Sequence, residues 1–347
     1  MKRVKTGVIG CGFISEIYIK NLTSLFDNVE VVAVSDINIG DAKKRAKQFG
    51  ISKACLPEDL YADAEVELIV NLTIPKAHAE VSLAAIRAGK HVYVEKTLAI
   101  TLEEADAVLQ AAKERGLLVG CAPDTFLGAG IQTCKEIIEL GEIGLPTLVS
   151  GVMASGGPET WHPNPEFLYK TGAGPLFDMG PYYITTMLEL FGNVTGVTAM
   201  AKKTFEERMI TSEPLNGRMI QVEVPTNVAA VLSFGDGPVG NLIMSFDANG
   251  YMQRMEVFGT KGTIIVPDPN YFAGPVLLKK NGCEDWKEVP LVNRLSDNSR
   301  GMGIADMAKA IQTGSPFSAT GARGRHVLEV MYAIYSSPEE MTHKTLH

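Results

Sequence analysis

The 347-residue chain lacks several features that would place it in a specialised protein class. No apolar run approaches the roughly 18–20 residues that a membrane-spanning helix needs. The five cysteines are scattered and form no CxxC pair or Cys/His cluster, which argues against a disulfide framework or a structural metal site. With 32 basic and 40 acidic residues the net charge is −8, so a basic surface for nucleic acid or anionic lipid is not expected.

What remains is an ordinary globular composition. Hydrophobic residues make up 46% of the chain and charged residues 21%, which is enough apolar material for packed cores. At roughly 150 residues per domain, the length suggests two domains. The first residues, MKRVKTGVIG, lead into a strand pattern instead of a secretory signal. We therefore expect a cytoplasmic, metal-free protein that binds neither nucleic acid nor a membrane.

The first half alternates short β-branched runs with amphipathic helix patterns. Strands are predicted at 4–9, 29–34, 66–72, 91–94 and 117–121, and helices at 13–25, 41–49, 76–88 and 102–115. Nearly continuous apolar strands separated by helices indicate a doubly wound parallel sheet that is covered on both faces. We place this Rossmann-type, nucleotide-binding α/β domain at residues 1–123.

The second half, residues 124–347, predicts an α+β domain with a large, mainly antiparallel sheet. Helices are predicted at 127–140 and at about 180–191, with a loop rich in proline, glycine and aromatic residues at 156–174 between them. Strands with alternating patterns follow at 194–201, 219–224, 228–234, 239–246, 254–258, 263–266 and 276–279. The last helices, 302–312 and 321–335, are candidates to pack back on the first domain. Because a large sheet must cover its second face, we expect a homodimer or homotetramer.

A glycine turn follows the first predicted strand. Gly10 allows the tight turn, Gly12 lets the backbone approach a pyrophosphate, and the helix that begins near Phe13 and Ile14 supplies N–H groups. Asp36 ends the second strand at the distance expected for an acid that binds a ribose 2′-hydroxyl, although it also suits the cap of the next helix. An acid disfavours a 2′-phosphate, so we expect NAD as the cofactor and NADP less readily.

Residues able to contact a ligand follow the next two strands of the predicted sheet. They are Thr73, Ile74, Pro75, His78, Glu95, Lys96 and Thr97. The carboxyl ends of parallel strands meet at one edge of a sheet, where open α/β sheets bind ligands. Taken alone, the adjacent Glu95 and Lys96 are more typical of a surface ion pair.

Together with residues 10–15, these segments resemble the Gfo/Idh/MocA oxidoreductase family, which includes glucose–fructose oxidoreductase and inositol dehydrogenase. The family's usual motif here is Glu-Lys-Pro. This chain has Thr97 in place of the proline and retains Lys96. The resemblance covers essentially the whole chain and implies an open-faced C-terminal sheet used for oligomer contacts. It also implies hydride transfer between a nicotinamide cofactor and a secondary alcohol or ketone on a sugar, glycoside or cyclitol. The residues then expected to bind the cofactor include Thr73, Ile74, Pro75, His78 and Glu95.

The segment 172–183 resembles the family's glycine-rich approach to an Asp-x-x-x-His pair, with Asp178 present and Tyr182 in place of the histidine. An i,i+4 spacing puts both side chains on one face of a helix. A free tyrosine titrates near pH ~10 and a free histidine near ~6.5, but a nearby ammonium stabilises phenolate. The resemblance thus implies that Lys96 binds the reacting hydroxyl, that Lys96 or Tyr182 relays its proton, and that Asp178 orients both. Asp178 also suits a helix N-cap, and Tyr182 suits core packing.

Two further residues are candidates for substrate contacts. His162 lies in the loop just before the glycine run, where members of the family contact substrate, and Asp124 follows the strand at 117–121. Asp124 also suits the cap of the helix at 127–140. Because this region has no cluster of arginines, we expect a neutral polyol as substrate. The missing histidine at position 182 leaves a second function open, that of a cofactor- and sugar-binding sensor without catalysis.

Overall fold

The structure is a computed structural model that describes residues 2–293, 295, 297–340 and 344–345. It divides into two compact units, formed by residues 1–127 with 298–328 and by residues 128–297 with 329–347. The first unit runs to Leu127, beyond the boundary at 123 that the sequence suggested, and it includes a later stretch of chain. The division falls within the last long helix, α9 (Gly321–Glu340).

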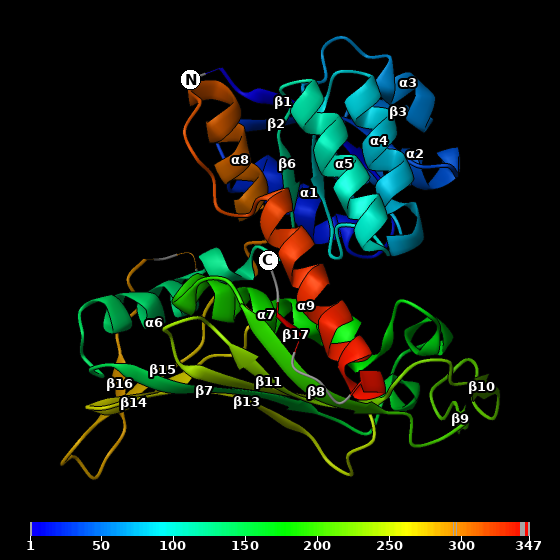
Figure 1. Cartoon of the computed structure of the whole chain (residues 1–347). Helices are drawn as coiled ribbons and strands as arrows, with labels where there is room; N and C mark the ends of the chain where they lie inside the picture. Colours follow the sequence, from blue (N-terminus) through cyan, green and yellow to red (C-terminus); the bar gives the residue numbers. More distant parts are fainter. Residues whose placement is uncertain (1, 294, 296, 341–343, 346–347) are drawn as a thin grey trace. The chain divides into compact units, whose positions relative to one another are not determined.

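The first unit is built on a parallel sheet with the strand order β3-β2-β1-β4-β5-β6 (Figure 1). Its strands are β1 (Val4–Ile9), β2 (Val29–Ser35), β3 (Lys53–Cys55), β4 (Leu68–Asn71), β5 (His91–Val94) and β6 (Val119–Cys121). All four residues of β4 are buried, as expected for the centre of a sheet that helices cover on both faces. The predicted doubly wound α/β architecture is confirmed.

Helices surround this sheet, and one of them comes from far along the chain. They are α1 (Ser15–Ser24), α2 (Ile39–Phe49), α3 (Pro57–Tyr61), α4 (His78–Arg87), α5 (Leu102–Glu114) and α8 (Met302–Thr313). α8 packs against β1 and β6, and the Asn28 side chain donates to the Ala305 carbonyl at 2.8 Å. The sequence analysis did not predict β3 and α3, because elements of three and five residues are too short to show a periodicity.

The second unit contains, among the described residues, a nine-stranded sheet in the order β16-β15-β14-β13-β7-β12-β11-β8-β17. Its strands are β7 (Pro146–Ala154), β8 (Gly196–Lys202), β11 (Asn227–Ser233), β12 (Val239–Ser245), β13 (Met252–Gly259), β14 (Gly262–Val266), β15 (Val276–Lys280), β16 (Lys287–Val289) and β17 (Lys344–Thr345). β7 pairs in parallel with β12 and antiparallel with β13. The other pairs are antiparallel, so the predicted mainly antiparallel sheet is confirmed.

Two expectations for this unit need correction. The central strand β7 was not predicted, because its run PTLVSGVMA is interrupted by polar residues and Gly151. The strand expected at 219–224 does not join the large sheet. It forms β10 (Met219–Gln221), which pairs with β9 (Glu207–Met209) in a separate two-stranded sheet.

Helices cover one face of the large sheet. α6 (Ala129–Glu139) packs on β14 and β15, and α7 (Gly174–Phe191) packs on β7, β11 and β12 (Figure 1). On the strands, buried residues alternate with exposed ones, as a sheet covered on one face requires. The exposed set includes the apolar side chains Met200, Val231, Val239, Ile243 and Met252.

Candidate active site

The glycine turn after β1 has the form that a dinucleotide site requires. Gly10 has φ 97°, and a Cβ there would lie 2.6 Å from the carbonyl carbon and oxygen of Leu72, so only glycine fits. A Cβ at Gly12 would meet nothing within 4 Å, which leaves open space where a pyrophosphate would approach. The Ser15 hydroxyl donates to the Gly12 carbonyl at 2.6 Å and is fully buried, so serine fits at the usual position of the third small residue.

Asp36 is fixed beside this turn by backbone groups. Its Oδ2 accepts from the Cys11 N–H at 2.8 Å and its Oδ1 from the Asn38 N–H at 2.9 Å. The cap of α2 is Asn38, whose side chain accepts from the Gly40 N–H at 3.0 Å, so the alternative role of Asp36 as a cap is wrong. The carboxylate thus stands at the end of β2, next to the glycine turn, where a ribose hydroxyl is expected.

The sequence analysis did not predict that an arginine on α2 supports the backbone of the glycine turn. The Arg45 guanidinium on α2 donates to the Gly12 carbonyl at 3.0 Å and pairs with Glu16 on α1 at 3.0 Å. Phe13 and Ile74 are exposed beside the turn and the end of β4. These residues fit a nicotinamide dinucleotide, because backbone N–H groups, an acid and apolar faces are what its phosphates, ribose and rings need.

His78 does not take the cofactor-binding role that the sequence predicted. Its side chain is fully buried, with Nδ1 at 2.5 Å from the Thr97 carbonyl oxygen and Nε2 at 3.0 Å from the Thr73 carbonyl oxygen. Burial lowers the pKa of the His78 imidazole. His78 therefore connects the loops that follow β4 and β5, and it acts on a ligand only through the segments that it positions.

The turn after β5 is held by its own side chains. Glu95 accepts from the Tyr18 hydroxyl at 2.8 Å through Oε1 and from the Lys96 N–H at 2.7 Å through Oε2. Thr97, which replaces the family's proline, donates through its hydroxyl to the Ala99 carbonyl at 2.8 Å. Lys96 is half-buried in this turn. Glu95 thus fixes the backbone from which the Lys96 side chain extends.

Asp124 is not the substrate ligand that the sequence predicted. Its side chain is 1% exposed, and its Oδ2 accepts from the N–H groups of Gly301 and Gly303 at 2.8 and 3.0 Å. Burial raises the pKa of the Asp124 carboxyl to about 6. Asp124 holds the start of α8 and is not accessible to a hydroxyl of a substrate. Its alternative role as the cap of the next helix is also wrong, because the N-cap of α6 is Gly128.

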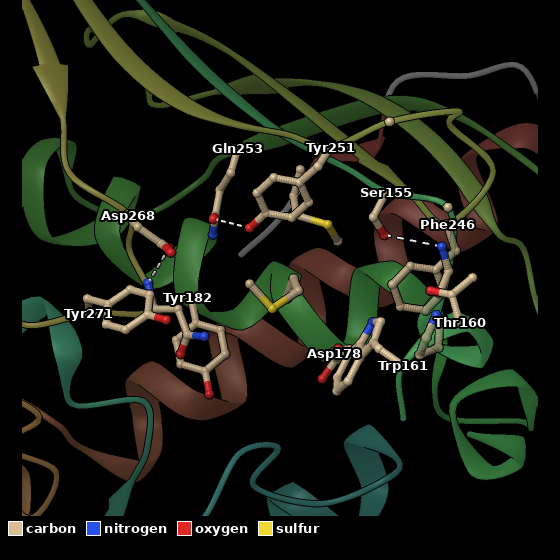
Figure 2. Close-up of a pocket in the computed structure, with 17 residues that line it drawn as sticks. Ser155, Thr160, Trp161, Asp178, Tyr182, Phe246, Tyr251, Gln253, Asp268 and Tyr271 are labelled. Carbon is tan, nitrogen blue, oxygen red and sulfur yellow. Dashed lines mark hydrogen bonds between the residues drawn. The ribbon is translucent and has the colours of Figure 1, made fainter. Parts of the chain in front are cut away.

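The second unit has a pocket of about 610 Å³, lined by residues of this unit (Figure 2). Asp178 and Tyr182 of α7 both line it, as their i,i+4 spacing predicted. α7 begins at Gly174 with Ala173 as its N-cap, so the helix starts earlier than predicted and Asp178 is not a cap. Tyr182 is 8% exposed, and its neighbour Tyr183 is fully buried. Tyr182 therefore borders the pocket while packing at its edge.

Sequence reasoning missed a second group of polar residues in this pocket. Asp268 and Asn270 follow β14, and the Asp268 Oδ1 accepts from the Asn270 N–H at 2.9 Å. Gln253 is the second residue of β13 and accepts a hydrogen bond from the Tyr251 hydroxyl (Figure 2). The only sequence signal was the polar, proline-containing loop after the strand predicted at 263–266.

Trp161, not His162, lines the pocket within the described chain. The His162 ring lies edge-on to Trp161 and Phe167, at centroid distances of 5.4 and 5.5 Å, and its Nδ1 accepts from the Asn164 N–H at 3.0 Å. The predicted substrate contact by His162 is therefore not supported. Trp161 is 68% exposed, and its ring, with those of Tyr251 and Tyr271, gives the pocket aromatic faces.

Neither a metal site nor a membrane-spanning helix is present among the residues that the structure describes. No group of three or more His, Cys, Asp or Glu side chains is arranged to hold a metal ion there. None of the helices in this part of the chain is both long enough and apolar enough to span a bilayer.

Comparison with known proteins agrees with this geometry. Residues 4–122 match the family model described as oxidoreductase family, NAD-binding Rossmann fold, and residues 131–265 match the GFO/IDH/MocA C-terminal domain. The chain belongs to the Gfo/Idh/MocA oxidoreductase family. Its first unit is an NAD-binding Rossmann domain, and the predicted nicotinamide cofactor is confirmed.

Relatives of this family member are similar along most of its length. It is 25% identical to a myo-inositol 2-dehydrogenase of Thermotoga maritima over 97% of both chains. It is 29% identical to inositol 2-dehydrogenase 3 of Saccharopolyspora erythraea, over 82% of this chain and 80% of that one. A levoglucosan dehydrogenase in complex with NADH and L-sorbose has the same fold, with a TM-score of 0.86, 22% identity and complete coverage of both chains.

Proposed function

We propose that this oxidoreductase interconverts a secondary alcohol and a ketone on a sugar, glycoside or cyclitol. The observation that carries the proposal is the pocket of the second unit, where Asp178 and Tyr182 share a cavity with Asp268, amide groups and aromatic rings. A neutral polyol needs both kinds of group, because its hydroxyls bond carboxylates and amides while its C–H faces pack on aromatic rings. The names of the inositol dehydrogenases among its relatives support the same substrate class.

Oxidation of a secondary alcohol removes a hydride from carbon and a proton from the attached oxygen. When bound, NAD supplies the acceptor for the hydride. We assign the proton to Lys96 and Tyr182, and the orientation of both to Asp178. An ammonium beside the hydroxyl stabilises the developing alkoxide and favours the phenolate form of Tyr182, and the phenolate oxygen then accepts the proton of the substrate hydroxyl.

We also propose that the exposed apolar face of the large sheet forms contacts in a homodimer or homotetramer. Met200, Val231 and Met252 on that face are each more than half exposed, and a face of this kind is normally covered. Sedimentation at micromolar concentration tests this assignment, and a monomer would contradict it.

A second function is favoured by one observation, the tyrosine at position 182 where the family has histidine. A protein of this fold without an effective proton acceptor would bind cofactor and sugar and act as a sensor. Lys96 and Asp178, both retained, count against this alternative.

Turnover on a panel of free sugars, methyl glycosides and cyclitols separates the two functions. Reduced nicotinamide is followed by its absorbance, with NAD and NADP in parallel and Lys96→Met as the control. A dehydrogenase gives turnover with at least one polyol, and that turnover is lost in Lys96→Met. Silence over the whole panel, with NAD binding intact, would overturn the proposal in favour of the sensor.

A further inference from the structure

Arg208 connects two parts of the second unit that are distant in sequence. It lies on β9, in the two-stranded sheet outside the large one. Its Nε donates to Glu159 at 2.6 Å and its Nη1 to Asp247 at 2.6 Å. Glu159 belongs to the short 3-10 helix Pro158–Thr160, and Asp247 follows β12. One guanidinium therefore links the β9–β10 sheet, this short helix and the end of β12.

The cluster around Arg208 is buried and internally satisfied. The side chains of Arg208, Glu159 and Asp247 are 11%, 6% and 5% exposed. The second oxygen of Glu159 accepts from the Tyr169 hydroxyl, and the second oxygen of Asp247 accepts from the Thr226 hydroxyl at 2.6 Å. With both carboxylates bonded on both oxygens, the arrangement has the geometry that a buried ion cluster needs to be stable.

The same cluster holds the backbone that forms one wall of the pocket. Arg208 also donates to the carbonyl oxygens of Gly156 at 2.8 Å and Phe246 at 3.1 Å, and both residues line the pocket. A Cβ at Gly157 would lie 2.4 Å from a Glu159 carboxylate oxygen, so the wall passes directly over the ion cluster. Movement of Arg208 would therefore shift the backbone that lines the pocket.

The strand that carries Arg208 also fixes the segment that leads to Trp161. The N–H groups of Thr211 and Ser212, just beyond β9, donate to the Glu159 carbonyl at 2.9 and 3.1 Å. The Ser212 hydroxyl donates to the His162 carbonyl at 2.6 Å. Trp161 lies between Glu159 and His162, whose carbonyl groups are held in this way, and its exposed ring faces the pocket (Figure 2).

We propose that Arg208 is a positioning residue for substrate binding, which holds the wall 156–162 so that Trp161 presents its ring to the sugar or cyclitol. The nature of the ligand rests on the proposed function, whereas the positioning of Trp161 does not. The planar fork of arginine is what allows one side chain to bond Glu159, Asp247 and two carbonyls together. Lysine keeps the charge but cannot make these contacts simultaneously.

The chain offers a direct reporter for this role, because it has two tryptophans, Trp161 and Trp286. In a Trp286→Phe background, Trp161 is the single tryptophan, and its fluorescence and its quenching by acrylamide report on the pocket wall. Arg208→Lys is compared with Arg218→Lys, a matched control in the same region. Arg218 pairs with Glu166 at 2.8 Å and is 56% exposed. Titration with myo-inositol, scyllo-inositol and D-glucose, in the presence of NADH, measures binding in each variant.

We expect Arg208→Lys to fold, to bind NAD as the parent does, and to change the quenching of Trp161 at least twofold. The KM for the polyol turned over should rise about tenfold or more while kcat falls less than threefold. Arg218→Lys should leave the quenching of Trp161, the KM and kcat unchanged. Should Arg208→Lys fail to fold, Tyr169→Phe removes a single hydroxyl from the cluster and is expected to shift the same readouts in the same direction.

Unchanged Trp161 quenching and unchanged KM in a folded Arg208→Lys or Tyr169→Phe variant would overturn the proposal. An equal change in Arg218→Lys would overturn it too, since the effect would then be general to this region. The fluorescence readout needs no turnover. If no polyol reacts, the proposed function fails, and a Trp161 signal altered by Arg208→Lys alone still supports the positioning role.

Discussion

Around Gly10 and Gly12 the first unit offers a ligand mostly backbone groups, whereas the pocket of the second unit is lined by residues from α7, β7, β13 and three loops. In the first unit the close approach of Leu72 dictates glycine, so the site follows from the topology of the sheet. In the second unit Asp178, Trp161 and Asp268 all lie outside the strands of the sheet. The comparison explains how one fold keeps its cofactor while its substrate varies.

The two units also differ in how each uses a carboxylate that the sequence offered as a substrate ligand. Asp124 in the first unit is enclosed and binds the backbone N–H groups of Gly301 and Gly303. Asp178 in the second unit is half-buried and lines the pocket. We therefore propose that Asp124 fixes the start of α8 and that Asp178 contacts the substrate, although both were candidates for substrate binding.

The largest effect is expected from Lys96→Met. Loss of the ammonium removes stabilisation of the alkoxide, and kcat should fall about 10³-fold, within the range for loss of a proton-transfer group. NAD affinity, measured by fluorescence titration, should stay within threefold, because the backbone site is untouched. Near-normal kcat in this variant would show that Lys96 has no part in the reaction.

The two glycines of the turn provide the next test. Gly10→Ala places a methyl group 2.6 Å from the Leu72 backbone and should cost about 3 kcal/mol of unfolding free energy. Gly12→Ala meets no protein atom within 4 Å, so its unfolding should match the parent while its NAD affinity falls about tenfold. Thermal unfolding measures the stability of both glycine variants, and titration with NAD measures their affinity. If both variants were destabilised equally, the assignment of the open space at Gly12 to the cofactor would be contradicted.

The two carboxylates are separated by their asparagine variants. The folded protein raises the pKa of Asp124 to about 6, so it holds this proton to higher pH than the unfolded chain does. Stability from this group is therefore present at low pH and is lost as the pH rises through about 6. Asp124→Asn avoids that loss and should gain on the order of 2–3 kcal/mol at pH 8 and little at pH 4.

The matched variant is Asp178→Asn, which should leave unfolding unchanged and lower kcat/KM by about 10²-fold. Denaturation at the two pH values and steady-state kinetics provide both readouts. A reversed pattern, with Asp124→Asn affecting turnover and Asp178→Asn affecting stability, would overturn the contrast between the two carboxylates.

The smallest effect is expected at Asp36. Asp36→Ser removes an acceptor for the ribose hydroxyls and the charge that repels a 2′-phosphate. The ratio of NAD to NADP affinity should fall about tenfold, and loss of the bonds from the Cys11 and Asn38 N–H groups should lower the unfolding temperature by a few degrees. An unaltered ratio would show that cofactor choice is made elsewhere.

The sequence predicted the first unit better than the second, for a physical reason. Backbone geometry requires glycine at position 10, and Asp36 follows directly on β2, so both leave a local pattern in the sequence. β7 left none, because a Cβ at Gly151 would lie 3.0 Å from both Met187 and Tyr183 on α7, and the resulting glycine interrupts the strand pattern. Close packing of a helix thus removed the signal of a central strand.

Within the candidate site the errors have a common origin. His78, Asp124 and His162 are residue types that bind ligands, and only tertiary structure shows that each bonds the protein's own backbone. Conversely, Asp268 and Asn270 come from a loop whose place in the pocket depends on the pairing of β13 with β14. The resemblance found Asp178 and Tyr182 because their spacing is local to one helix.

The most direct test of the account is the transfer of deuterium to the cofactor. The polyol with the highest turnover in the panel is prepared with deuterium on its ring carbons and incubated with NAD, and the reduced nicotinamide is examined by mass spectrometry. We predict reduced cofactor that carries one deuterium, together with a ketone product, and loss of both in Lys96→Met. Reduced cofactor without deuterium, or none from any polyol while NAD binds normally, would contradict the assignment of this chain as a polyol dehydrogenase.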